Sequence, residues 1–209
     1  MRYLGIMDMK EWKPRLPVRM FSTHQPPRKD TMTAEGKYVY LARNPWDVCV
    51  SFFHMATSFS NRSYKGIAAA TEDYFNHVAL GYALRDEPNV FFLTYEQLIA
   101  DTRGTVLRLA RFIDESYARE LEQDDGMLQR LLKRRHGTRR IQPAVKGHGG
   151  GPNKYCLVRE AKVGSWKGYF TQEQLRRLEA KIREEEKKSS FMDLWKDIRE
   201  EALAASTKH

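Results

Sequence analysis

Two side chains in this sequence stand where ligands bind in parallel β-sheets. Arg43 follows the apolar run Tyr38-Val-Tyr-Leu-Ala42, and Tyr95 follows the similar run Val90-Phe-Phe-Leu-Thr94. Short runs of β-branched and aromatic residues predict buried strands. Ligands of parallel sheets gather at the carboxyl ends of the strands. Spacing alone therefore places Arg43 and Tyr95 at strand ends where a ligand is expected to bind.

The charge of the chain also favours an anionic partner. Lys and Arg number 36 against 27 Asp and Glu, a net charge of +9. Nucleic acid, phospholipid or a nucleotide would each suit that charge. The densest basic run, residues 130–140, is interpreted first as a solvated helix end and second as a surface that steers anions. The sequence contains no recognised nucleic-acid motif, so we expect no nucleic-acid partner.

Length and composition predict one globular domain over residues 1–209. Hydrophobic residues make up 41% of the chain, and no apolar stretch has the length of a membrane span. The first residues lack the pattern of a signal peptide, so we expect a cytoplasmic protein without a membrane partner. Cys49 and Cys156 stand far apart, which argues against a disulfide framework or a metal site. For Cys49 we expect a buried free thiol.

A helix is predicted to start directly after Arg43 and to run to about residue 58. Asn44 is a good N-cap, Pro45 suits the first helical position, and an acidic residue follows at position 47. Two faces are expected for this helix. The apolar face, turned to the sheet, contains Val48, Cys49, Phe52, Phe53 and Ala56, and the polar face contains Asp47, Ser51, His54 and Ser58.

The remaining segments complete an α/β pattern. A short strand is expected at residues 18–22 and a proline-rich loop at 23–27, and residues 1–17 show no regular pattern. Two strand–helix units predict a parallel sheet with helices on its faces. Helices are expected at 95–98, 102–114, 115–140 and 172–188, with a flexible stretch at 148–153 and a last amphipathic helix from Phe191 that frays after 203.

Four segments resemble the cytosolic sulfotransferases, which use 3′-phosphoadenosine 5′-phosphosulfate (PAPS). They occur in family order and span residues 18 to 171. The segments are Phe21-Ser-Thr-His-Gln-Pro26, Tyr38-Val-Tyr-Leu-Ala-Arg-Asn-Pro-Trp-Asp-Val-Cys-Val-Ser-Phe-Phe-His54, Phe92-Leu-Thr-Tyr-Glu-Gln-Leu98 and Leu157-Val-Arg-Glu-Ala-Lys-Val-Gly-Ser-Trp-Lys-Gly-Tyr-Phe-Thr171. The resemblance implies the P-loop-NTPase-like sulfotransferase fold.

The resemblance also implies a role for each matching residue. His24 would be the general base that takes a proton from an acceptor hydroxyl or amine. The 3′-phosphate of the donor would be held by Arg43, Ser51 and Arg159, and Tyr95 would lie beside the adenine. Sulfuryl transfer would be an in-line displacement that needs no metal. The acceptor pocket is expected to involve Phe52, Met55 and the loop 59–70, which suggests a small apolar or phenolic acceptor.

Several positions depart from the family pattern. The family's first strand and its P-K-S-G-T-T-W phosphosulfate loop are not found before Val18, so we expect a partial domain. Ser22 stands in place of the lysine of K-T-H, and Glu160-Ala161 replaces Lys-Gly after Arg159. In the family's dimer motif Lys167 and Thr171 match but Gln172 and Arg176 do not, which makes dimerisation doubtful.

Three other functions compete with a transferase. A nucleotide or sugar kinase would need a G-x-x-x-x-G-K-[ST] loop, which the chain lacks. A hydrolase would need a G-x-S-x-G elbow to accompany His148-Gly-Gly-Gly151, and none follows. The strongest alternative is a non-catalytic or inactive paralogue that at most binds the nucleotide.

Overall fold

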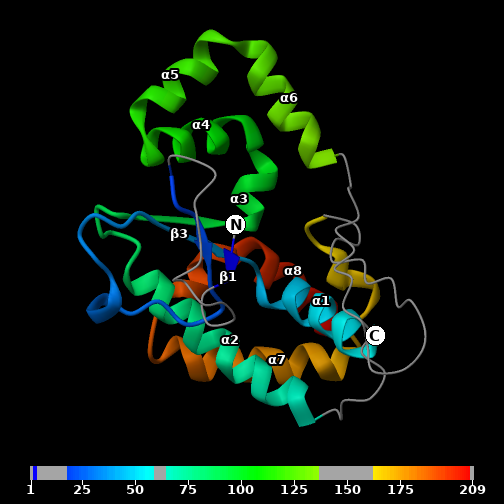
Figure 1. Cartoon of the computed structure of the whole chain (residues 1–209). Coiled ribbons are helices and arrows are strands. Elements are labelled where there is room, and N and C mark those ends of the chain that lie inside the picture. Colours follow the sequence, from blue (N-terminus) through cyan, green and yellow to red (C-terminus); the bar gives the residue numbers. More distant parts are fainter. Residues whose placement is uncertain (1, 4–17, 59–64, 137–161, 208–209) are drawn as a thin grey trace, which may run out of the picture.

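The computed structural model describes residues 2–3, 18–58, 65–136 and 162–207. At its centre, strands β3 (Tyr38–Ala42) and β4 (Val90–Thr94) run parallel. They pair in register from Tyr38 opposite Val90 to Ala42 opposite Thr94. The chain passes from one strand to the other through α1 (Pro45–Ser58) and α2 (Lys65–Ala83), which lie below the sheet in Figure 1. This parallel strand–helix–strand arrangement confirms the predicted α/β class.

A second, very short parallel pair differs from the prediction. Only Phe21–Ser22 (β2) of the expected strand 18–22 is extended in a ladder, and its partner is Arg2–Tyr3 (β1). That partner lies in residues 1–17, a segment for which the sequence predicted no regular structure because of the prolines at 14 and 17. Two residues on each strand satisfy few backbone groups, so this pair adds little stability by itself.

Helix α1 starts as predicted but turns a different face to the interior. The Asn44 side-chain oxygen accepts a hydrogen bond from the Asp47 amide at 2.8 Å, which caps the helix. Trp46 and Val50 are buried, whereas Phe53 is 38% exposed. The prediction of the inward face was wrong because apolar residues occur all around this helix, so their periodicity could not identify the face that packs on the core. Cys49 is unpaired as predicted, and burial raises its pKa to about 11.

Helix α2, which was not predicted from the sequence, covers one face of the sheet. Phe75 and Val78 are buried in the main core. The Tyr40 ring of β3 stacks on Phe92 of β4, with ring centroids 5.4 Å apart. The opposite face of β3 is open, so the prediction of a fully buried strand was wrong. On that face Val39 is 50% and Leu41 52% exposed, because neighbouring side chains of a strand point to opposite sides.

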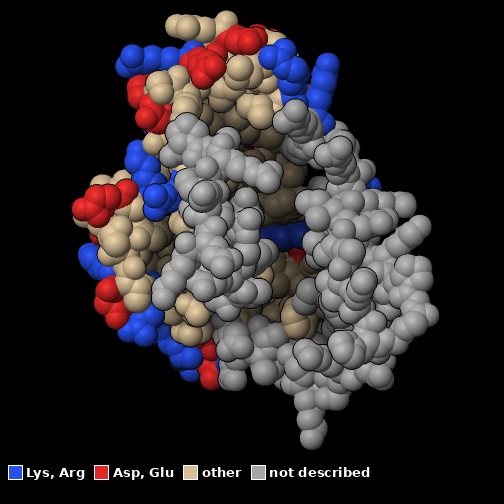
Figure 2. Space-filling view, in the orientation of Figure 1, with Lys and Arg blue, Asp and Glu red and all other residues tan. Residues whose placement is uncertain are grey.

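Four helices follow β4 and form a smaller unit above the sheet in Figure 1. Their buried centre is a separate cluster of Ala110, Ala118, Leu121 and Leu128. Figure 2 shows acidic and basic side chains intermixed over this unit. From the basic run, Arg130 faces Asp124 at 3.6 Å, and residues 137–140 lie outside the described part. The helices are α3 (Tyr95–Ala100), α4 (Thr102–Ile113), α5 (Glu115–Gln123) and α6 (Asp125–His136).

The C-terminal part returns to the main core. Its elements are η3 (Ser165–Gly168), α7 (Gln172–Glu186), η4 (Phe191–Trp195) and α8 (Lys196–Thr207). The last helix continues to Thr207, so the predicted fraying after residue 203 was wrong. Thr171 caps α7 in a capping box with Gln174. Among the described helices, none combines the length and the apolar character needed to cross a membrane.

Candidate functional site

Arg43 and Tyr95 lie against each other at the carboxyl ends of β3 and β4. The guanidinium carbon of Arg43 is 4.6 Å from the centre of the Tyr95 ring, a cation–π distance. Arg43 Nη2 also donates a hydrogen bond to the carbonyl oxygen of Lys162 at 3.0 Å. Parallel pairing brings the two strand ends to one edge, so residues 52 positions apart become neighbours. Both side chains thus stand at the carboxyl ends of paired strands, the position that spacing predicted, and there they contact each other.

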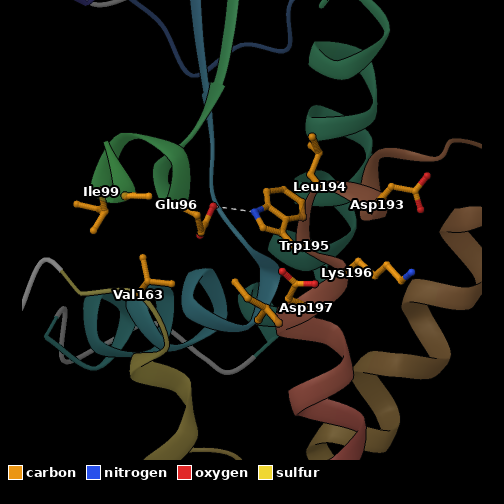
Figure 3. Close-up of a pocket in the computed structure, with 10 residues that line it drawn as sticks. Glu96, Ile99, Val163, Asp193, Leu194, Trp195, Lys196 and Asp197 are labelled. Carbon is orange, nitrogen blue, oxygen red and sulfur yellow. Dashed lines mark hydrogen bonds between the residues drawn. The ribbon is translucent and has the colours of Figure 1, made fainter. Parts of the chain in front are cut away.

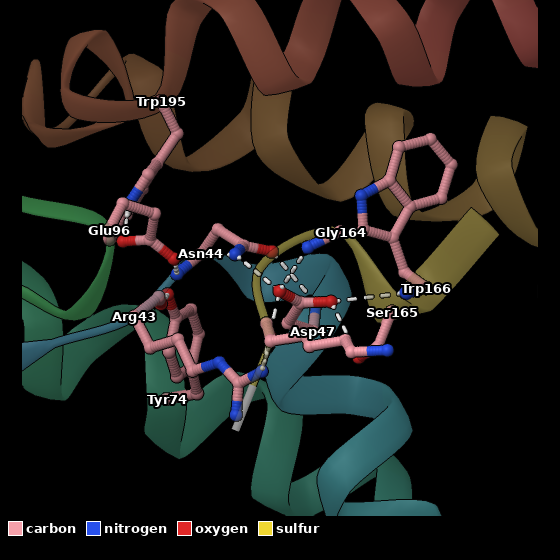
Figure 4. Close-up of polar contacts among 10 residues, drawn as sticks. Arg43, Asn44, Asp47, Tyr74, Glu96, Gly164, Ser165, Trp166 and Trp195 are labelled. Carbon is pink, nitrogen blue, oxygen red and sulfur yellow. Dashed lines mark hydrogen bonds and ion pairs between the residues drawn. The ribbon is translucent and has the colours of Figure 1, made fainter. Parts of the chain in front are cut away.

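Asp47, expected on the polar outer face of α1, is instead fully buried. One carboxylate oxygen accepts hydrogen bonds from the Asn44 side-chain amide at 3.0 Å and from the Gly164 amide at 2.9 Å. The other accepts from the Ser165 hydroxyl at 3.0 Å and from the Trp166 amide at 3.1 Å. Figure 4 shows the carboxylate between the start of α1 and this late segment. Four donors explain how a carboxylate can be buried here.

The same carboxylate faces the arginine of the candidate site. Arg43 Nη2 is 3.4 Å from an Asp47 oxygen. Burial alone would raise the pKa of Asp47, but the hydrogen bonds from Asn44, Gly164 and Ser165 and the charge of Arg43 together hold this pKa below its ordinary value. Asp47 therefore stays ionised at neutral pH and fixes one edge of the guanidinium.

A second carboxylate, that of Glu96, joins the two strand ends. Glu96 Oε1 accepts hydrogen bonds from the Asn44 amide at 3.1 Å and from the Asn44 side chain at 2.6 Å. Glu96 Oε2 accepts from the indole N–H of Trp195 at 2.7 Å. Glu96 follows Tyr95 and Asn44 follows Arg43, so this carboxylate links the backbones on which both site residues stand (Figure 4).

The guanidinium of Arg43 keeps a donor that the described residues do not satisfy. Its Nε atom is buried and has no hydrogen-bond partner in the described part of the chain, while the side chain as a whole is 26% exposed. A charged donor without an acceptor is costly in a folded protein. The exposed part of the guanidinium stands beside the Tyr95 ring, a combination that fits an anionic group next to a flat one.

The other predicted site residues are more scattered. Ser51 is exposed on α1, about two turns after Arg43. His24 lies on the loop after β2, with an exposed side chain, and Phe52 is half-buried on α1. Met55 belongs to α1, but its side chain is outside the described part, and Arg159 lies in the segment 137–161, which is also outside it.

A described groove lies beside this site and not on it. It has a volume of about 440 Å³ and lies between α3 and the C-terminal elements (Figure 3). Glu96 and Ile99 of α3, Val163 and residues 193–198 form its walls. Its only link with the polar network is the hydrogen-bonded pair of Glu96 and Trp195. Arg43 and Tyr95 do not line it, so we base the candidate site on them and not on this groove.

Sequence reasoning missed the partners that hold the site together. Trp195 and Glu96 are 99 positions apart, and Asp47 is 117 positions from Gly164. No local sequence pattern predicts contacts between residues so far apart in the chain. A buried aspartate at the start of a helix looks in sequence like any aspartate that favours the helix dipole.

Comparison with known proteins places these residues in one family. The family model described as "Sulfotransferase domain" matches residues 8–190. An amine sulfotransferase from Oryctolagus cuniculus is 26% identical over 207 residues, covering 88% of this chain and 66% of the relative. Cytosolic sulfotransferase 10 from Arabidopsis thaliana is 30% identical over 195 residues, covering 83% of this chain and 57% of the relative. The chain thus spans between about half and two thirds of the length of these relatives.

Solved structures give the same answer for the fold. Retinol dehydratase in complex with androsterone and the inactive cofactor PAP (3′-phosphoadenosine 5′-phosphate) matches with a TM-score of 0.60 and 27% identity. The match covers 85% of this chain and 56% of that one. A mouse sulfotransferase complexed with PAP matches with a TM-score of 0.58 and 20% identity, over 91% of this chain and 73% of that one. At that identity the second likeness supports the fold alone.

Proposed function

Because the chain belongs to the sulfotransferase domain family, we propose that it binds PAPS at Arg43 and transfers the sulfuryl group to a hydroxyl or amine of a small acceptor. The observation that carries this proposal is the stacked pair of Arg43 and Tyr95 at the carboxyl ends of two parallel strands. That pair offers a fixed cation and an aromatic face at the edge where ligands of such sheets bind.

In this proposal each predicted site residue has one task. Arg43 and Ser51 hold the 3′-phosphate, and Tyr95 lies beside the adenine with the ring face that Arg43 leaves open. Arg159 joins the same phosphate on the strength of the sequence resemblance alone. Support for the ligand comes from two similar solved structures, both complexes with PAP, the product nucleotide 3′-phosphoadenosine 5′-phosphate.

The transfer step needs a base on the acceptor side. His24 takes the proton of the acceptor's hydroxyl or amine, because an imidazole near neutral pH can accept one. The nucleotide, when bound, supplies the sulfuryl group and the leaving group. Apolar or phenolic acceptors fit Phe52 and Met55, and androsterone and retinol in similar structures support that class. A cytoplasmic location belongs to the same proposal, since several relatives are named cytosolic sulfotransferases.

A second candidate function is nucleotide binding without transfer. Ser22 stands where the family pattern has a lysine, so a positive charge near the transferred group is replaced by a neutral hydroxyl. Losing one donor of this kind commonly lowers a rate by a factor of about a hundred. This candidate predicts that PAP binds through Arg43 while no acceptor is sulfated.

Calorimetric titration with PAP tests the nucleotide site. We expect binding that Arg43→Ala weakens at least about tenfold, because a charge-assisted contact to phosphate is lost. Arg85→Ala is the matched control, since Arg85 makes the same type of cation–π contact with Tyr82 at 4.0 Å, in the turn that follows α2. Equal affinities of the two variants, or a wild-type chain that ignores PAP, would contradict the proposal.

An assay with PAPS and 4-nitrophenol separates the two candidates. Sulfated product would support the transferase. Binding of PAP without any product, also across a panel of aliphatic alcohols and amines, would support the binding protein.

A further inference from the structure

The family match ends at residue 190, yet the residues after it are among the most buried in the described structure. Phe191 is 0%, Met192 1% and Trp195 2% exposed. They belong to the same core cluster as Trp46 at the start of α1. Helix α8 packs along α7, and Arg199 of α8 forms ion pairs with Glu179 and Glu186 of α7. The segment 191–207, which we call the C-terminal segment, is therefore an integral part of the main core.

This segment also reaches the candidate site through one hydrogen bond. The indole N–H of Trp195 donates to Glu96 Oε2, and the other Glu96 oxygen holds the backbone and side chain of Asn44. Asn44 in turn donates to Asp47, whose carboxylate faces Arg43. Each step of this path is a contact between described atoms, and the path ends at the guanidinium.

The charge of Glu96 makes the Trp195 contact more than packing. A partly buried carboxylate needs its donors, and a hydrogen bond to a charged group contributes more than a neutral one. Without the indole N–H, the Glu96 carboxylate would turn toward water or toward Asn44. Either movement shifts the backbone that carries Tyr95 or the one that carries Arg43, and small displacements in such sites have large effects on ligands.

We propose that Trp195 is a positioning residue of the nucleotide site and that the C-terminal segment, outside the family match, thereby becomes part of that site. The proposal rests on the proposed function, since it concerns the geometry in which Arg43 and Tyr95 meet PAP. Trp195 does not touch the nucleotide in this proposal. It acts through Glu96.

Calorimetry with PAP on two packing-matched variants tests the effect on binding. Trp195→Phe keeps an aromatic side chain but removes the N–H, whereas Phe191→Leu disturbs the same core without touching Glu96. At a temperature where both variants are fully folded, we expect Trp195→Phe to weaken PAP binding about five- to tenfold, less than the loss of a charge-assisted hydrogen bond to the ligand itself, because Trp195 acts through Glu96. Phe191→Leu should lower the melting temperature and leave the affinity within about twofold.

Glu96→Gln breaks the same contact from the other side. Glutamine has one acceptor oxygen in place of two, so it cannot accept from both Asn44 and Trp195, and its effect on PAP affinity should not add to that of Trp195→Phe. Full additivity in the double variant would overturn the proposed path. If Trp195→Phe does not fold, Glu96→Gln against Phe191→Leu carries the same comparison.

Amide hydrogen exchange without nucleotide tests the path independently of PAP. The amides of Asn44 and Asp47 donate to Glu96 Oε1 and to the Asn44 side chain. Relative to the Ile182 amide as a reference in the core, we expect Trp195→Phe to lower their protection about tenfold and Phe191→Leu to leave it unchanged. Equal protection in both variants would overturn the inference. If the wild-type chain binds no PAP but Trp195→Phe lowers the protection of these amides as expected, the proposed function is contradicted, while the contact of Trp195 with Glu96 is still shown to position Asn44 and Asp47.

Discussion

At the scale of single residues, the candidate site places a cation between one carboxylate and an aromatic ring. Asp47 holds one edge of Arg43, and the ring of Tyr95 covers one of its faces. A guanidinium fixed in this way has lost much of its side-chain entropy before any ligand arrives. The fixed geometry favours binding of an anion, since less ordering remains to be done on association.

Asp47→Asn should lower the free energy of unfolding at neutral pH and make that free energy depend less on pH in the acid range. The pKa of Asp47 lies below its ordinary value in the folded state. Its ionised form therefore contributes stability above the unfolded pKa of about 4, and this contribution is lost as the pH falls toward the folded pKa. We expect a loss of about 3 kcal/mol at pH 7 that shrinks below about pH 4.

Urea denaturation at a series of pH values measures this effect. Asp86→Asn is the control, because the Asp86 side chain is 81% exposed and its ion pair with Arg85 should contribute little. An Asp47→Asn variant that is equally destabilised at pH 7 and pH 3 would show that the loss comes from packing and not from the charge.

His24→Gln should remove transfer and leave nucleotide binding intact. In the proposed reaction His24 acts on the acceptor, so PAP affinity should change less than about twofold while the rate of sulfation falls between about a hundred- and ten-thousandfold. Rates with PAPS and 4-nitrophenol and calorimetry with PAP measure the two quantities. A variant that keeps the wild-type rate would exclude His24 as the base.

At the scale of elements, the sequence predicted what local chemistry decides. Strands β3 and β4 were predicted with their observed bounds, because short β-branched and aromatic runs are bounded by polar residues. The cap at Asn44 followed from its side chain and from the proline after it. For α1 the inward face could not be predicted, since apolar residues surround the helix and the burial of Asp47 depends on donors from residues 164–166.

Helix α2 was missed although its second half carries a recognisable pattern. Tyr74, Phe75, Val78 and Tyr82 recur at the spacing of one helical face. Its packing against the sheet could not be derived from that pattern. The close approach of Gly81 to the Tyr40 ring depends on how helix and strand meet, which only the folded structure defines.

Gly81→Ala should be strongly destabilising for this reason. A Cβ atom at Gly81 would lie 2.4 Å to 2.6 Å from three atoms of the Tyr40 ring. The ring is fixed by its stack on Phe92 and by hydrogen bonds of its hydroxyl to His77, so it cannot easily move away. We expect a loss of about 2 to 3 kcal/mol, as for other overpacked cores.

Thermal or urea denaturation provides the measurement, with Gly168→Ala as the matched control. No atom lies within 4 Å of a Cβ built at Gly168, so this variant should change stability by less than about 1 kcal/mol. If both alanine variants melt at the same temperature, the contact between α2 and β3 is looser than the structure indicates.

At the scale of the whole molecule, the described residues bury two separate apolar clusters. The main cluster contains three tryptophans, from α1, η3 and η4, and includes residues that are 149 positions apart in the chain, Trp46 and Trp195. The smaller cluster lies within α4, α5 and α6 and contains mostly alanine and leucine. A cluster with so little buried apolar area stabilises its helices less than the main core stabilises its own.

Leu128→Ala and Ile182→Ala compare the two clusters directly. Both side chains are fully buried, Leu128 in the smaller cluster and Ile182 in the main one, and each truncation should lower the stability of its own cluster by about 2 to 5 kcal/mol.

Because the clusters are separate, we expect Leu128→Ala to raise hydrogen exchange in α4 to α6 alone. Ile182→Ala should raise it throughout the chain. Exchange measured by mass spectrometry distinguishes these outcomes, and PAP binding should survive Leu128→Ala because Arg43 and Tyr95 directly follow the paired strands β3 and β4 and are not part of the smaller cluster. Equal loss of protection in α7 in both variants would mean that the chain unfolds as one cooperative unit.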